Sequence, residues 1–284
     1  MIQSLKKRTG ASIRKICAVL EYPSSSYHAA AKPTPTELQD QVLGDEIEVI
    51  FANHRRRYGY RRVIDDLNDL NLACSPARAR RLMKERGLYA IQPKNFVPKT
   101  SDGRADKPSP NLLGEQGLPD APNKVWAGDL TFIPTSVGWR YLAVVIDLYS
   151  RKIVGWSLAS HMRADLACEA FQNALDSRHD CEEVIFHSDR GIQYGSRKFR
   201  ALLAGVKARQ SMSARANPYD NAWTESFIGT LKNEMLQNGV FIDESDARTE
   251  LFAYIDGYYN THRKHSSLGY ISPSQFESKS PNQN

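Results

Sequence analysis

The chain has few cysteines and no long apolar segment, and both absences narrow what it can be. Its 284 residues contain four cysteines, with no C-x-x-C pair and no histidine at zinc-finger spacing from them. We therefore expect neither a disulfide framework nor a structural zinc site. No apolar stretch approaches the length of a membrane span, and the basic start at Lys6 has no apolar signal region after it. The expected location is the cytoplasm.

Net charge is modest, but it is distributed unevenly along the chain. Residues 1–100 contain 18 Lys and Arg against 10 Asp and Glu, whereas the remainder contains 20 against 22. Because basic side chains neutralise phosphates, the first third is the predicted nucleic-acid-binding part. A hydrophobic content of 41% is enough for the cores of two or three domains.

Proline marks the main predicted boundary. Six of the 14 prolines lie between residues 92 and 124, so we expect an extended linker at 92–123. Before it we expect a short helical segment at 1–34 and a helical domain at 35–91. After it, residues 124–284 have the pattern of an α/β domain.

The helical domain has the pattern of a helix-turn-helix. Helical periodicity covers 37–53 and 61–70, and the turn 71–74 leads to Ser75 as N-cap, Pro76 as first helical residue and Gly87 as stop signal. Basic residues gather here, interleaved with aromatics. The 55–62 cluster fits either a base-reading surface or a solvated or core-supporting face, and it supports phosphate contact better than sequence specificity. The predicted DNA-binding residues are Arg55, Arg56, Arg57, Arg61, Arg62, Arg78, Arg81 and Lys84.

Beyond the linker, apolar runs predict strands at 125–134, 140–149 and 152–159, the last two preceded by short turns. A helix at 163–177, a strand at 183–188, a helix at 196–204, a short strand near 207–211 and two further helices follow. The order βββαβαβαα is that of a ribonuclease-H-like α/β core, an assignment that rests partly on a family resemblance of the motifs within it, and an all-α domain precedes this core.

Three acidic residues lie in distinctive local patterns. Asp129 interrupts a β-rich apolar run in V-W-A-G-D-L-T-F, Asp189 ends another in F-H-S-D-R-G, and Glu225 lies in N-A-W-T-E-S-F on a predicted amphipathic helix over 219–238. Carboxylates that converge from separate elements are the ligands of a two-metal site for phosphodiester chemistry. Asp147 also ends a strand, and a structural bond to Ser150 or Arg151 is its predicted role.

The same segments resemble a known family. The sequence is similar to the retroviral-integrase-like transposases of bacterial insertion sequences, specifically the second-frame (OrfB) product of the insertion-sequence-three family. The motifs are W-A-G-D-L-T-F-I, H-S-D-R-G-I-Q-Y, N-A-W-T-E-S-F with Lys232 seven residues after Glu225, and Y-N-T-H-R-K-H-S-S-L-G-Y-I-S-P. Lys264 departs from the proline that family members often have before the histidine.

The resemblance implies an integrase-type catalytic core in residues 124–284. Asp129, Asp189 and Glu225 would form the catalytic, metal-binding triad, and Lys232 would contact terminal DNA. It also implies two Mg²⁺ ions, with Mn²⁺ able to substitute, and a reaction that cleaves 3′ ends and transfers strands. Implied partners are the terminal inverted repeats, target DNA, the upstream-frame (OrfA) product or a fusion to it, and further copies of the chain on nucleoid DNA.

Two other functions fit parts of the pattern. A ribonuclease-H-type nuclease shares the metal chemistry, but it usually uses four acids and lacks a basic amino-terminal part. A non-catalytic DNA-binding regulator would need the basic helices without the triad.

Overall fold

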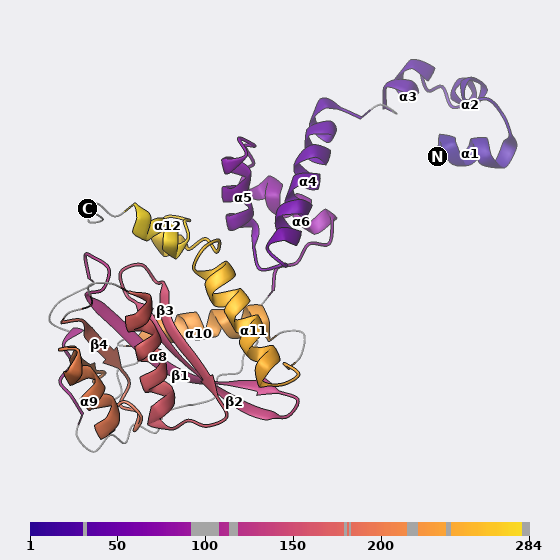
Figure 1. The fold of residues 1–284 in the computed structure, drawn as a ribbon. Helices are drawn as coiled ribbons and strands as arrows, with labels where there is room; N and C mark the ends of the chain where they lie inside the picture. The colour runs from indigo at the N-terminus through magenta and orange to yellow at the C-terminus, as the bar shows by residue number, and fades with distance from the viewer. Residues whose placement is uncertain are drawn as a thin grey trace. The chain divides into compact units, whose positions relative to one another are not determined.

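The computed structural model describes residues 1–30, 33–91, 108–113, 119–178, 181, 183–214, 221–236 and 240–279 (Figure 1). The chain divides into two compact units, Met1–Ala90 and Ile91–Asn284. Among the described helices, none is long and apolar enough to cross a membrane.

In the described part of the first unit, every secondary-structure element is a helix. Helices α1 (Ile2–Thr9), α2 (Ile13–Val19) and α3 (Ser24–Ala30) precede α4 (Pro35–Asn53), α5 (Tyr60–Asp69) and α6 (Pro76–Glu85). Helices α4, α5 and α6 pack on one another around a core that includes Ile47, Val63, Leu67 and Ala79.

The local signals at α6 act as predicted. The Ser75 hydroxyl accepts a hydrogen bond from the Arg78 amide at 3.3 Å, and Pro76 is the first helical residue. Gly87 has a φ of 67°, a left-handed conformation that glycine adopts without strain. The helix-turn-helix arrangement of α5 and α6 therefore follows from capping chemistry together with a short turn.

Part of the predicted linker is docked onto the second unit. Residues 92–107 and 114–118 lie outside the described residues, but residues 108–113 run beside strand β5 (Arg209–Met212). The Met212 amide donates to the Pro110 carbonyl at 3.2 Å, and the Leu112 amide donates to the Ser211 hydroxyl at 2.9 Å. These bonds cover the free edge of β5.

The second unit is built on a mixed five-stranded sheet of order β3-β2-β1-β4-β5. Strands β1 (Val125–Thr135), β2 (Gly138–Asp147) and β3 (Ile153–Ala159) are antiparallel, as predicted, whereas β4 (Ile185–Ser188) and β5 run parallel to β1. Together with the intervening helices, this arrangement confirms the predicted ribonuclease-H-like fold.

Helices cover both faces of the sheet (Figure 1). On one face, α8 (Ala164–Ser177) and α9 (Arg197–Gly205) bury Phe171 and Phe199 against the strands. On the other face, α10 (Ala222–Met235) and α11 (Glu244–Tyr254) contribute Phe227, Leu231 and Leu251 to a second apolar cluster. Packing in these two clusters fixes the positions of the helices on the two faces of the sheet.

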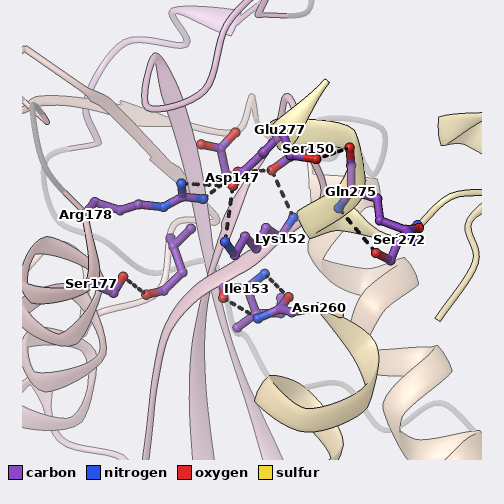
Figure 2. A network of polar contacts seen from close by, with 12 residues as sticks. Asp147, Ser150, Lys152, Ile153, Ser177, Arg178, Asn260, Ser272, Gln275 and Glu277 are labelled. Atoms are coloured by element: carbon purple, nitrogen blue, oxygen red, sulfur yellow. Dashed lines mark hydrogen bonds and ion pairs between the residues drawn. The ribbon is translucent and has the colours of Figure 1, made fainter. Parts of the chain in front are cut away.

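The carboxyl-terminal segment is tied to the sheet by buried polar contacts, shown in Figure 2. The π-helical turn η2 (Ile255–Tyr259) extends α11, and the 3₁₀ turn η3 (Ser266–Leu268) leads to α12 (Pro273–Ser278). The Asn260 amide group bonds both the N–H and the carbonyl of Ile153, each at 2.9 Å. Glu277, which is 4% exposed, accepts from Ser150 at 2.7 Å and pairs with Lys152 and Arg178.

Candidate active site

Two of the three predicted acids lie where two neighbouring strands stop pairing. Strand β1 pairs with β4 only from Val125 to Gly128, and the last pair in register is Gly128 with Ser188. Asp129 and Asp189 are the residues directly after this pair. The parallel pairing therefore brings the two acids side by side at the carboxyl end of β4, and ligand sites in open α/β sheets form at the carboxyl ends of strands.

Local bonds hold both aspartates. Asp129 is only 9% exposed, and its Oδ1 accepts a hydrogen bond from the Leu130 amide at 2.8 Å. Asp189 Oδ1 accepts from the Gly191 amide at 2.9 Å. A Cβ on Gly191 would lie 2.9 Å from that oxygen, so only glycine allows this turn without displacing the carboxylate.

Glu225 comes to the same place from another layer. It lies in the first turn of α10, where Phe227 and Leu231 are buried against the sheet and Glu225 is exposed on the other side. The helix is shorter than the predicted 219–238, and residues 215–220 and 237–239 lie outside the described residues. The four-residue apolar period predicted this orientation correctly.

The three acids act on one another electrostatically. Burial, followed by the charges of Asp189 and Glu225, raises the pKa of Asp129 to about 8, although the hydrogen bond from Leu130 and the charge of Lys232 oppose the shift. Partial burial and the charge of Asp189 also raise the pKa of Glu225. The structure therefore concentrates negative charge at one point, and a bound cation would relieve the repulsion.

Lys232 lies on α10 two turns after Glu225 and close to the acids. Its ammonium is 4.1 Å from the centre of the Phe132 ring, in cation–π geometry. Burial lowers the pKa of Lys232, and Asp129 acts in the opposite direction. The predicted helix face of Lys232 is correct, and the contact with Phe132 was not predicted.

Asp147 lies away from the triad. It is fully buried, and its carboxylate accepts from the amides of Asn123 at 2.8 Å and Tyr149 at 2.9 Å. The predicted structural bond to Arg151 is present through the backbone, because the Arg151 amide donates to the Asp147 carbonyl at 2.8 Å. Its role in the described structure is to close the turn after β2.

The predicted DNA-binding arginines of the first unit fall into two groups. Arg78 and Arg81 pair with Asp40 of α4, at 2.6 and 2.5 Å, so both tie α6 to α4. The remaining predicted residues lie outside these ion pairs, in the turn after α4 and on α5 and α6. They are Arg55, Arg56, Arg57, Arg61, Arg62 and Lys84, of which Arg57 and Arg62 are half-buried and the others exposed.

Family models match both units. An integrase core domain matches residues 119–218, a second integrase core model matches 206–273, and an HTH-like domain matches 37–96. The transposase for insertion sequence element IS904 of Lactococcus lactis is 40% identical over 246 residues, which are 87% of this chain and 97% of that protein. The chain belongs to the insertion-sequence-three family of transposases.

Other family members have similar coverage. The transposase InsF for insertion sequence IS3A of Escherichia coli is 38% identical over 94% of both chains. The insertion element IS600 31 kDa protein of Shigella sonnei is 36% identical over 93% of this chain and 98% of that protein. The similarity of this transposase to its relatives therefore covers both the integrase-type core and the helical unit.

Several site residues escaped prediction from the sequence. Tyr194 is 2% exposed, and burial together with the charges of Asp129 and Asp189 raises its pKa. Its sequence signal was the last letter of H-S-D-R-G-I-Q-Y. Glu234 on α10 forms a buried ion pair with Arg263 at 2.8 Å, and nothing local in the sequence pairs residues so far apart.

Proposed function

We propose that this transposase cleaves a 3′ end of its insertion sequence and joins the freed 3′-hydroxyl to another phosphodiester. Asp129, Asp189 and Glu225 would be the catalytic acids. The observation that carries the proposal is the convergence of these carboxylates beside the point where β1 and β4 stop pairing, where burial and the charge of Asp189 raise the pKa of both Asp129 and Glu225. Family membership supports the same reaction class, polynucleotidyl transfer.

The donor set fits divalent metal ions. It consists of carboxylate oxygens, which Mg²⁺ and Mn²⁺ prefer, and the structure gives the buried Asp129 carboxylate like-charged neighbours in Asp189 and Glu225. We propose two Mg²⁺ ions held by this triad, with Mn²⁺ able to substitute. When bound, such ions polarise the phosphate, acidify the attacking hydroxyl and stabilise the leaving oxygen.

The chain's own residues would position the reactants. The Gly191 turn fixes Asp189, the apolar face of α10 fixes Glu225, and the ammonium of Lys232 would hold a phosphate beside them. Cleavage and joining are both in-line displacements at phosphorus, so one site can perform them without a covalent protein intermediate.

The wider assembly is part of the proposal. The helical unit would bind the terminal inverted repeats through exposed basic residues such as Arg55, Arg61 and Lys84. We further propose that the chain works on target DNA at the nucleoid as an oligomer, with the upstream-frame product or fused to it.

The test replaces each acid by its amide. Asp129→Asn, Asp189→Asn and Glu225→Gln should each reduce cleavage and joining by at least about a thousandfold, because each loses transition-state stabilisation by metal. DNA binding should persist. Asp147→Asn tests specificity, because its carboxylate bonds only backbone amides here and its loss should act through stability. Near-normal joining by Glu225→Gln, alone or in the fused form, would refute the assignment.

A further inference from the structure

The β1–β2 hairpin extends beyond β4 from the point where Asp129 lies, and beyond β3 from the pair Phe132 and Tyr141. Pairing of β1 with β4 ends at Gly128, whereas pairing with β2 continues to Thr135 and Gly138. Figure 1 shows the two strands continuing past the ends of their neighbours. The hairpin therefore begins beside the proposed catalytic site and leads away from it.

The tip of the hairpin is braced. The Ser136 amide donates to the Phe241 carbonyl at 2.7 Å, and the Phe241 amide donates to the Pro134 carbonyl at 3.3 Å. Arg140 pairs with Glu244 of α11 at 2.8 Å. A hairpin held in this way presents its side chains in a fixed arrangement, which reduces the entropy lost when a ligand binds.

An exposed tryptophan lies on this braced hairpin. Trp139 is 56% exposed, while Trp126 is fully buried in the core. Trp139 and Phe132 meet in a T-shaped arrangement, with ring centres 5.1 Å apart and planes at 81°. The same Phe132 ring contacts the Lys232 ammonium, which interacts electrostatically with Asp129. An indole, a phenyl ring and an ammonium thus form a continuous surface leading to the acids.

We propose that Trp139 stacks against an unpaired nucleobase at the DNA end that undergoes cleavage and joining. The inference rests on the proposed function, since it places the reacting phosphate near Lys232. Phe132 is the positioning residue, because it supports both the indole and the ammonium.

The chemistry favours a nucleobase. A phosphodiester must reach the carboxylate of Asp129, a residue that is only 9% exposed. An intact base pair beside that phosphodiester would obstruct the approach. Opening the terminal pair costs unstacking energy, and stacking on an aromatic side chain compensates for it. The adjacent ammonium matches the phosphate of the same nucleotide. A purely apolar protein partner would gain nothing from that charge.

The experiment compares two DNA ends taken from the element itself. One is fully paired, and the other has its terminal base pairs mismatched and carries 2-aminopurine at the unpaired position. Binding is measured by fluorescence anisotropy at one salt concentration, and stacking is measured by quenching of 2-aminopurine. The proteins are full-length wild type, Trp139→Ala, Trp139→Phe and Phe252→Ala.

Phe252 is the matched control. It is an exposed aromatic on α11, with 61% of its surface accessible. Trp139→Ala should weaken binding of the mismatched end by about 5- to 160-fold, the range for loss of one base–aromatic stack, and should abolish quenching. Trp139→Phe should restore most of both signals, and Phe252→Ala should behave as wild type. Thermal unfolding of each variant verifies that the fold is retained.

Three results would overturn the inference. The first is wild-type quenching and affinity in Trp139→Ala. The second is an equal loss of affinity of this variant for the paired and the mismatched end. The third is a change in its oligomeric state without a change in quenching. The last result would identify the surface as a protein interface. Glu225→Gln separates this inference from the proposed function, because its joining activity tests the triad while 2-aminopurine quenching tests Trp139.

Discussion

The buried ion pair between Glu234 and Arg263 gives the sharpest prediction of stability. Arg263 Nε lies 3.0 and 3.1 Å from the two Glu234 carboxylate oxygens, and a terminal guanidinium nitrogen lies 2.8 Å from one of them. Both side chains are 7% exposed. The Tyr254 hydroxyl also donates to Glu234 at 2.8 Å.

Removing one partner leaves a buried charge without its counter-ion. Arg263→Ala should therefore lower the free energy of unfolding by about 3–5 kcal/mol, and Glu234→Gln should also be strongly destabilising. The apolar double variant Glu234→Leu/Arg263→Met should be much milder, close to neutral, because no charge remains to desolvate. Glu234 lies on the helix that carries Glu225 and Lys232, so joining activity should fall with the single variants and return in the double variant.

Urea unfolding followed by tryptophan fluorescence measures this effect. All four tryptophans lie after residue 124, so the signal reports the second unit. The midpoint should fall while the slope stays constant, which indicates a change in stability alone. A cost below about 1 kcal/mol for Arg263→Ala, or a double variant that costs the sum of the single variants, would refute the reasoning.

Three further predictions concern packing and DNA contacts. Gly155→Ala should destabilise the core by about 1–3 kcal/mol or more, because the new Cβ would lie 2.3 Å from the Ala170 carbonyl and 2.5 Å from the Ala174 amide. Gly205→Ala is the control, since open space surrounds Gly205, and it should be neutral or slightly stabilising in the same urea titration. Lys232→Ala should weaken end binding and joining with metal affinity nearly unchanged, and Lys232→Arg should recover part of both; wild-type behaviour of Lys232→Ala in both assays would reduce it to a solvated helix lysine. A fragment of residues 1–95 should bind DNA with steep salt dependence and a fragment of 124–284 should bind weakly, and equal affinities in a salt titration would contradict the uneven charge distribution.

The sequence by itself determined the elements and most of their order. Apolar runs gave the strands, a four-residue period gave the buried face of α10, and Ser75, Pro76 and Gly87 gave the limits of α6. These signals are local, because periodicity and capping depend on residues within a few positions of one another. The three acids were recognisable for the same reason, since each lies in its own short pattern.

Tertiary structure decided what the side chains contact. Arg78 and Arg81 look like DNA-binding residues in the sequence, and the fold pairs both with Asp40. The parallel pairing of β1 with β4 is what puts Asp129 beside Asp189, 60 residues later in the numbering. The same long-range packing pairs Glu234 with Arg263 and places Lys232 on Phe132, one ring away from Trp139. Such contacts join residues whose distance along the chain carries no signal, so only the packed core determines them.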